Sequence, residues 1–325
     1  MQMNVDTVMP WKRTETFRVI LTRSVIVLAM ASWFAGAAFA QSAAPKPFMS
    51  PQAAVTAFYN AVKLNDRKEA LAILGPSVEE WLLTGDTVAD RNAAKRFVAA
   101  YEQKHGLEMQ GNAKAILTVG NDDFPFAFAI IRREALWRFD PEGGKEELLA
   151  RRIGENELNA IEVLLAIVDA QFEYASLGVG KTGASQYARQ FASSPGKRDG
   201  LHWPVTKGEK ASPLGSLIAN AVAEGYRRST ENKPVPYHGY YYRMLLSQGP
   251  GAPDGPMDYV VNDRMIGGFA VIAYPAKYRV SGIISFMVSH DGTIYEADLG
   301  PESATNAKDI RIFNPASSWR AYVEK

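Results

Sequence analysis

Cysteine is absent from this chain of 325 residues. Its absence excludes disulfide bonds, cysteine nucleophiles, zinc sites with thiolate ligands and iron–sulfur clusters, and it excludes a lipid anchor attached to a cysteine. A chain of this length can bury enough apolar surface to fold without such crosslinks. The stability of the fold must therefore come from the packing of its core.

A strong excess of charge of one sign is also lacking. The chain has 36 basic and 35 acidic residues, and its net charge stays near zero when residues 1–40 are left out. Nucleic acids and anionic membranes attract proteins through clustered positive charge. The composition therefore gives no electrostatic reason to expect nucleic acid as a partner.

The motifs of several enzyme classes are missing. The sequence has no His-Glu-x-x-His pair for zinc and no Gly-x-Ser-x-Gly turn for a serine nucleophile. The run Gly178-x-Gly180-Lys181-Thr182 lacks the full spacing of a phosphate-binding loop, and no strand precedes it. We therefore predict no cofactor and no metal site, and the sequence does not favour an enzyme.

No apolar run is long enough to span a bilayer, which takes about 20 residues. The longest candidate, residues 25–35, follows Arg23 and is followed by Ala38-Phe39-Ala40. A positive flank, a short apolar core and a small-x-small exit are typical of a secretory signal peptide. We therefore expect residues 1–40 to be cleaved off after Ala40 and the protein to be periplasmic, with no membrane span after cleavage. An uncleaved N-terminal anchor is the alternative.

Residues 48–145 have the pattern of a small α+β domain behind a flexible leader at residues 41–47. Ser50-Pro51 opens a helix that ends at Asn65-Asp66, because Ser is a good N-cap and Pro suits the first helical position. Further helices are predicted at residues 67–74, 78–83 and 90–104, and strands at residues 115–119, 126–131 and 136–139. This order predicts N-terminal helices packed on a short antiparallel sheet.

Residues 146–325 form the second predicted domain, which begins with a long helix. Apolar residues recur at helical spacing along residues 146–176, with an interruption at Gly154. Residues 140–144 before it are rich in Gly and Pro and predict a turn. Such a helix is longer than a compact domain needs, so it would bridge the two domains or kink.

The rest of the second domain favours an antiparallel sheet. One helix is predicted near residues 213–226. Strands are then predicted at residues 240–247, 258–261, 268–274, 282–289 and 293–298. The turn His290-Asp291-Gly292 between two alternating runs is a strong hairpin signal.

Polar residues on the long helix invite two interpretations. Gln171 lies on its buried side, where an amide needs partners, so Gln171 and Tyr174 are expected to anchor the loop that follows. Arg151-Arg152, Glu155 and Glu157 form a charge-balanced cluster, which surface ion pairs between helical neighbours explain.

The chain has four histidines. His290 lies in a turn and is expected to be exposed, whereas His105 follows a helix C-terminus, where positive charge suits the dipole. His202 and His238 are flanked by aromatic residues and, with Asp199, could form an acid–base or metal site. The competing interpretation is that these aromatic-rich loops pack on each other and the histidines supply hydrogen bonds.

Aromatic residues gather at residues 237–243. In a strand, Tyr240 and Tyr242 would point one way and Tyr241 and Arg243 the other. One face would be core, and the other could stack a sugar ring or a peptide, although tyrosine is also favoured in strands for packing alone. The candidate binding residues are Trp203, Tyr237, Tyr240, Tyr241, Tyr242 and Arg243.

Several stretches together resemble a family of exported bacterial proteins catalogued as domain of unknown function 2950. They are Arg151-Arg-Ile-Gly-Glu-Asn-Glu157, Ala170-Gln-Phe-Glu-Tyr174, Asp199-Gly-Leu-His-Trp-Pro204, Pro236-Tyr-His-Gly-Tyr-Tyr-Tyr-Arg243 and Gly268-Phe-Ala-Val-Ile-Ala-Tyr-Pro275. The resemblance supplies no activity.

Two further resemblances concern architecture. Residues 48–140 are similar to a cone-shaped domain of the nuclear transport factor 2 type, through Pro51-x-x-Ala54-Val-x-x-Phe58, Asn65-Asp66 and Trp137-Arg-Phe-Asp140. Residues 147–300 are similar to the head of a pilin or pseudopilin, through Asn156-Glu157, Ala160-Ile161, Ala170-Gln171-x-x-Tyr174, Gly239-Tyr240-Tyr241, Gly268-Phe269-Ala270, Ser285-Phe286 and Asp291-Gly292. A pilin helix starts with an apolar half that lies in the membrane, but residues 142–152 are charged. We therefore expect a soluble pilin-head-like module and no filament subunit.

These features predict an exported, non-enzymatic binding or envelope-assembly module, with an envelope protein or a cell-wall polymer as partner. The N-terminal domain would bind a small apolar ligand or act as a spacer. The alternative is a periplasmic hydrolase that uses Asp199, His202 and His238, which would then lie within hydrogen-bond reach of one another. A third hypothesis, an accessory of pilus or secretion assembly, rests on fold analogy alone.

Overall fold

The computed structural model describes residues 44–178, 185–227 and 234–323. Residues 42–325 form one compact unit. The predicted signal peptide at residues 1–40 lies outside the described residues, and so does most of the Gly178-x-Gly180-Lys181-Thr182 run. Within the described ranges, no helix has the length and apolar character needed to cross a membrane.

The N-terminal part begins with helices, as predicted. They are α1 (Pro51–Lys63), α2 (Arg67–Leu74), the short 3₁₀ turn η1 (Pro76–Val78), α3 (Glu79–Leu82) and α4 (Thr87–Gln103). The Ser50 hydroxyl accepts a hydrogen bond from the Ala53 amide at 3.1 Å, which confirms Ser50 as the N-cap of α1. Helix α4 starts three residues before the predicted position, because the Asp86 carboxylate caps it.

An antiparallel sheet follows these helices. Its strands are β1 (His105–Gln110), β2 (Lys114–Val119), β3 (Phe124–Pro125), β4 (Ala129–Arg133) and β5 (Leu136–Asp140). The order is β1-β2-β4-β5, with β3 also paired to β2. Strand β1 was not predicted, because it is a mostly exposed edge strand without apolar alternation. Backbone pairing to β2, in the register Leu107↔Leu117, holds it in place.

Helix α5 (Pro141–Ser176) is longer than predicted and is continuous through Gly154. Its 36 residues correspond to about 54 Å. The predicted turn at residues 140–144 is wrong, because Asp140 caps the helix and Pro141 takes its first position. Gly144 is needed there, since a Cβ would collide with the Ala127 carbonyl oxygen.

The C-terminal part forms a second antiparallel sheet. After α6 (Gly215–Glu224) come β6 (Tyr240–Leu245), β7 (Ser247–Gln248), β8 (Met257–Asp258), β9 (Val260–Val261), β10 (Arg264–Met265), β11 (Ala270–Pro275), β12 (Ile284–Ser289), β13 (Ile294–Asp298), α7 (Ser303–Asp309) and β14 (Arg320–Ala321). The main sheet has the order β14-β13-β12-β11-β6, and two short strand pairs, β7 with β8 and β9 with β10, lie outside it. The hairpin turn at residues 290–292 joins β12 to β13 as predicted.

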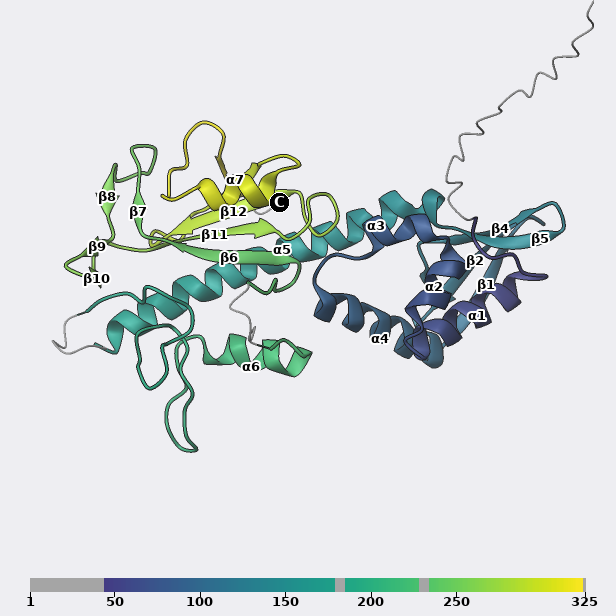
Figure 1. The fold of residues 1–325 in the computed structure, drawn as a ribbon, viewed down its shortest axis with the longest axis horizontal. Coiled ribbons are helices and arrows are strands. Elements are labelled where there is room, and N and C mark those ends of the chain that lie inside the picture. The colour runs from purple at the N-terminus through teal and green to yellow at the C-terminus, as the bar shows by residue number, and fades with distance from the viewer. Residues whose placement is uncertain (1–43, 179–184, 228–233, 324–325) are drawn as a thin grey trace, which may run out of the picture. The chain divides into compact units, whose positions relative to one another are not determined.

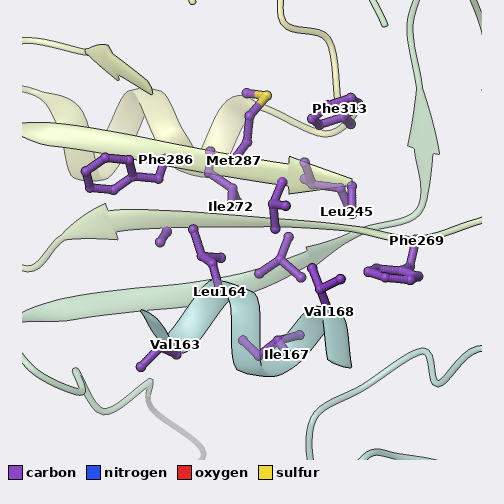
Figure 2. Packing of buried hydrophobic residues seen from close by; sticks show 14 of the residues in the cluster. Val163, Leu164, Ile167, Val168, Leu245, Phe269, Ile272, Phe286, Met287 and Phe313 are labelled. Atoms are coloured by element: carbon purple, nitrogen blue, oxygen red, sulfur yellow. The ribbon is translucent and has the colours of Figure 1, made fainter. Parts of the chain in front are cut away.

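The second sheet is covered on both faces. In Figure 1, α5 and α7 lie on opposite sides of β11 and β12. Figure 2 shows Leu164 and Val168 pointing from α5 toward the strands, while Met287 lies on the other side of the sheet. All three side chains belong to one hydrophobic cluster, and a second cluster fills the N-terminal part. The fold is α+β, as predicted, whereas the domain boundary at residues 145 and 146 falls inside α5 and stays a prediction.

The anchoring role predicted for Gln171 and Tyr174 is confirmed. The fully buried Gln171 amide donates to the Ala188 carbonyl oxygen at 2.8 Å and accepts from the Ala188 amide at 2.7 Å. The Tyr174 hydroxyl donates to the Arg198 carbonyl oxygen at 2.8 Å. These bonds fasten the irregular segment after α5 to the helix.

Candidate functional site

A cavity of about 790 Å³ is lined by the N-terminal helices, by α5 and by residues near the end of α6. Its apolar wall is built from phenylalanines of α1, α4 and the segment between β3 and β4. The rings of Phe58, Phe97 and Phe126 contact one another, with centroids 5.3–5.6 Å apart. Cavities of this size and lining are typical of small-molecule sites.

Arg152 brings a positive charge to the cavity. It lies one turn before Asn156 on the buried stripe of α5. Its guanidinium donates from Nη1 to the Trp81 carbonyl oxygen at 2.9 Å and from Nη2 to the Leu82 carbonyl oxygen at 3.0 Å. These carbonyls close the C-terminus of α3, where a cation suits the helix dipole. Burial lowers the pKa of Arg152, and the nearby charge of Asp90 opposes that shift.

Asp90 brings a negative charge to the same cavity. It lies in the first turn of α4, and its Oδ1 accepts a hydrogen bond from the Thr84 hydroxyl at 2.7 Å. Burial raises the pKa of Asp90, while hydrogen bonds from Thr84 and the charge of Arg152 act against the rise. Although the two charges influence each other, no ion pair joins Asp90 to Arg152 in the part of the chain that the structure describes.

A buried polar cluster lies beside the cavity and is centred on Asp86. Only 1% of Asp86 is exposed. Its Oδ1 accepts from the Val88 and Ala89 amides at 3.1 and 3.0 Å, which caps α4. Its Oδ2 accepts from the Tyr226 hydroxyl at 2.8 Å and from the Gly239 amide at 3.1 Å. One carboxylate therefore ties α4 to the residues that follow α6 and precede β6.

His238 and three tyrosines surround this cluster. The His238 Nε2 lies 3.4 Å from the Glu224 carboxylate, and His238 has a left-handed backbone with φ of 49°. The Tyr237 ring packs edge-on against Tyr226 with centroids 4.9 Å apart. Burial and the charge of Glu224 raise the pKa of Tyr237 to about 12. The Tyr242 hydroxyl is buried and has no hydrogen-bond partner among the described residues.

A model of one protein family matches residues 45–322 of the chain, and its description is protein of unknown function (DUF2950). The chain belongs to this family. No curated protein and no solved structure matches it. Membership in DUF2950 therefore confirms the family predicted from the sequence and assigns no activity.

The three candidate catalytic residues of this DUF2950 protein have separate hydrogen-bond partners. Asp199 accepts from the Ser194 amide at 2.7 Å and from Gln190 at 2.9 Å. The His202 Nδ1 lies 3.0 Å from the Ser212 hydroxyl, and burial lowers the pKa of His202. Among the described residues, no hydrogen bond or ion pair joins any two of Asp199, His202 and His238. No observation favours the hydrolase alternative.

The candidate aromatic residues are largely occupied by packing. Trp203 is buried against Tyr174, with ring centroids 6.3 Å apart. The Tyr240 hydroxyl donates to the Ile284 carbonyl oxygen at 2.8 Å, and Arg243 donates to the carbonyl oxygens of Ala307 and Ile310 on the α7 side. The remaining rings also have contacts: Tyr241 packs against Tyr274, Tyr237 against Tyr226, and Tyr242 against the core. All six residues therefore have packing or hydrogen-bond contacts within the protein, and their role in binding stays a prediction.

Two expectations about single residues are wrong. His290 is half-buried, because its ring packs edge-on against Tyr259 and Phe269. Surface ion pairs explain Arg151, which bonds Glu147 at 2.6 Å, but they do not explain Arg152. The helical spacing could have indicated the burial of Arg152, because the buried stripe of α5 extends backward through Asn156 to Arg152. An arginine on a buried stripe needs partners.

The cavity holds no cluster of metal ligands. Where the structure describes the chain, no group of three or more His, Asp or Glu side chains is placed to hold a metal ion. The site therefore offers an apolar wall, two opposite charges and fixed hydrogen-bonding groups, which suit binding of an organic molecule.

Proposed function

We propose that this protein is an exported, non-enzymatic binding protein whose cavity takes a small amphipathic molecule. The observation that carries the proposal is the cavity itself, because it combines an aromatic wall with two half-buried opposite charges. Apolar surface supplies affinity and a few polar groups fix orientation in small-molecule sites. The predicted signal peptide supports a role in the periplasm, where an envelope protein or cell-wall polymer would be a further partner.

Fluorescence of N-phenyl-1-naphthylamine, a neutral apolar dye, tests the binding function. The purified chain is expected to enhance the dye's emission, because the dye would enter the phenylalanine-lined cavity. Ala94→Trp on α4 places an indole in the cavity and is expected to weaken dye binding about tenfold, or about 1.4 kcal/mol. Ala99→Trp is the matched control, since Ala99 lies on the same helix, is exposed and does not line this cavity.

Two results would contradict the binding function. The first is failure of the dye to bind the unaltered protein, and the second is equal binding of the dye by the Ala94→Trp and Ala99→Trp variants. Circular dichroism of both variants shows that the helices are intact before the comparison is made.

Cell fractionation tests export. The full chain, expressed in a Gram-negative host, is expected in the periplasmic fraction with Gln41 as its first residue by mass spectrometry. Ala38→Phe is expected to block processing, because the exit site needs small residues. Full-length protein in the cytoplasmic fraction would refute the export proposal and leave the binding function to be judged by the dye.

A further inference from the structure

Arg152 and Asp90 both line the cavity, and no ion pair joins them within the described residues. The last two carbonyls of α3 hold Arg152, and Thr84, in the segment between α3 and α4, holds Asp90. Because both side chains are fixed in this way, neither is free to swing onto the other. The guanidinium still has N–H groups beyond the two that bond the carbonyls, since arginine has five.

The charged lining of the cavity is balanced. Four arginines and four carboxylates contribute to it, namely Arg67, Arg91, Arg96, Arg152, Asp66, Asp90, Glu155 and Glu224. A ligand with a net charge would therefore meet as much repulsion as attraction from the wall. A ligand that carries both charges can satisfy the wall without changing its net charge.

We propose that the cavity binds a small zwitterion with an apolar body, whose carboxylate contacts Arg152, whose ammonium contacts Asp90, and whose apolar body lies on the phenylalanine wall. An apolar α-amino acid and a short apolar peptide share this chemistry. The inference rests on the proposed binding function and names its ligand class.

The energetics favour a ligand with both charges. Half-buried charges are partly desolvated, and burial shifts the pKa values of Asp90 and Arg152 toward their neutral forms. A planar guanidinium pairs with a carboxylate through two parallel hydrogen bonds, which adds strength and direction. A ligand with only one of the charges would pair with one wall group and cover the other, which would keep its hydrogen bonds but lack an opposite charge, and this is unfavourable.

Calorimetric titration of the unaltered protein with related indoles tests the proposal. L-Tryptophan carries both charges, 3-indolepropionate lacks the ammonium, tryptamine lacks the carboxylate and 3-methylindole lacks both. L-Tryptophan or L-leucyl-L-tryptophan is expected to bind about tenfold or more tighter than the three reduced probes. The tighter of these two zwitterions identifies the source, amino acid or peptide.

Substitutions assign each charge to its wall residue. Arg152→Gln is expected to weaken L-tryptophan and 3-indolepropionate but not tryptamine, whose ammonium would lose a repulsive neighbour. Asp90→Asn is expected to weaken L-tryptophan and tryptamine but not 3-indolepropionate, for the corresponding reason. Arg151→Gln and Asp169→Asn are the matched controls on α5, because both positions are exposed, and neither is expected to alter binding.

Arg152 also bonds two backbone carbonyls, so the melting temperature of the Arg152→Gln variant is measured beside its binding. The indole series on the unaltered protein tests the proposal without any substitution. Tight binding of 3-methylindole, or binding of N-phenyl-1-naphthylamine with no binding of either zwitterion, would overturn the ligand class and leave the binding function intact. Failure of every probe, the dye included, would overturn both.

Discussion

Replacement of Asp86 by alanine is expected to destabilise the fold by about 4 kcal/mol. The change removes the cap of α4, and an N-cap contributes about 1 kcal/mol. It also leaves the Tyr226 hydroxyl and the Gly239 amide without their acceptor, and an unsatisfied buried donor costs about 1–3 kcal/mol. The free energy of unfolding is measured by urea denaturation with circular dichroism.

Asp66→Ala is the matched control for this prediction. Asp66 caps α2 through one bond to the Glu69 amide at 3.0 Å and is exposed, so its loss is expected to destabilise by only about 1 kcal/mol. In a double-mutant cycle, Tyr226→Phe is expected to recover part of the loss in the Asp86→Ala background, because the hydroxyl is then no longer left unpaired. Equal losses in the Asp86→Ala and Asp66→Ala variants would refute the assignment of Asp86 as the tie between these segments.

Two further outcomes are expected. Gly144→Ala is expected to destabilise the fold by about 2 kcal/mol, because the new Cβ would collide with the Ala127 carbonyl. Gly154→Ala on the same helix has open space around it and is expected to stabilise the fold by up to about 1 kcal/mol. Urea denaturation checks both variants, and equal effects would contradict this reasoning. Burial holds the pKa of His202 in the folded protein below its ordinary value of 6.5. Between these two pKa values the unfolded chain binds more protons than the folded protein. The stability that His202 contributes is therefore expected to fall as the pH drops below about 6.5. Thermal melts from pH 8 to pH 4 of the protein and of His202→Gln check this, and an unchanged pH profile in the variant would contradict it.

The sequence predicted local structure well where hydrophobic periodicity is strong. The helices at α1, α2 and α4, the strands β6, β11, β12 and β13 of the second sheet and the hairpin at residues 290–292 follow from spacing and turn chemistry, whereas β14 was not predicted. Gln171 was identified because an amide on a buried stripe must find partners. Strand β1 and helix α7 were missed, because both have few apolar residues and depend on pairing or packing with distant segments.

The candidate site was harder to predict because its residues are far apart in the sequence. Asp86 and Tyr226 are 140 residues apart, and nothing local to either one indicates the other. His202 and His238 were chosen as candidates because histidine can act as an acid, a base or a metal ligand. The cavity instead uses Asp90 and Arg152, whose types are common on any surface and whose burial only the tertiary structure reveals.

Helix α5 and the Asp86 cluster explain why the cavity depends on the C-terminal half of the chain. Arg152 lines the cavity, and one turn later the Glu157 carboxylate accepts from the Ile283 and Ile284 amides at 2.9 and 3.0 Å at the start of β12. At the other wall, the cap of α4 is shared with Tyr226, and α4 carries Asp90. Arg152 therefore comes from α5 and is held by carbonyls of α3, whereas Asp90 comes from a helix whose cap is tied to Tyr226. A boundary at position 145 would place Asp90 in one segment and Arg152 in the other, so both halves of the chain line the cavity.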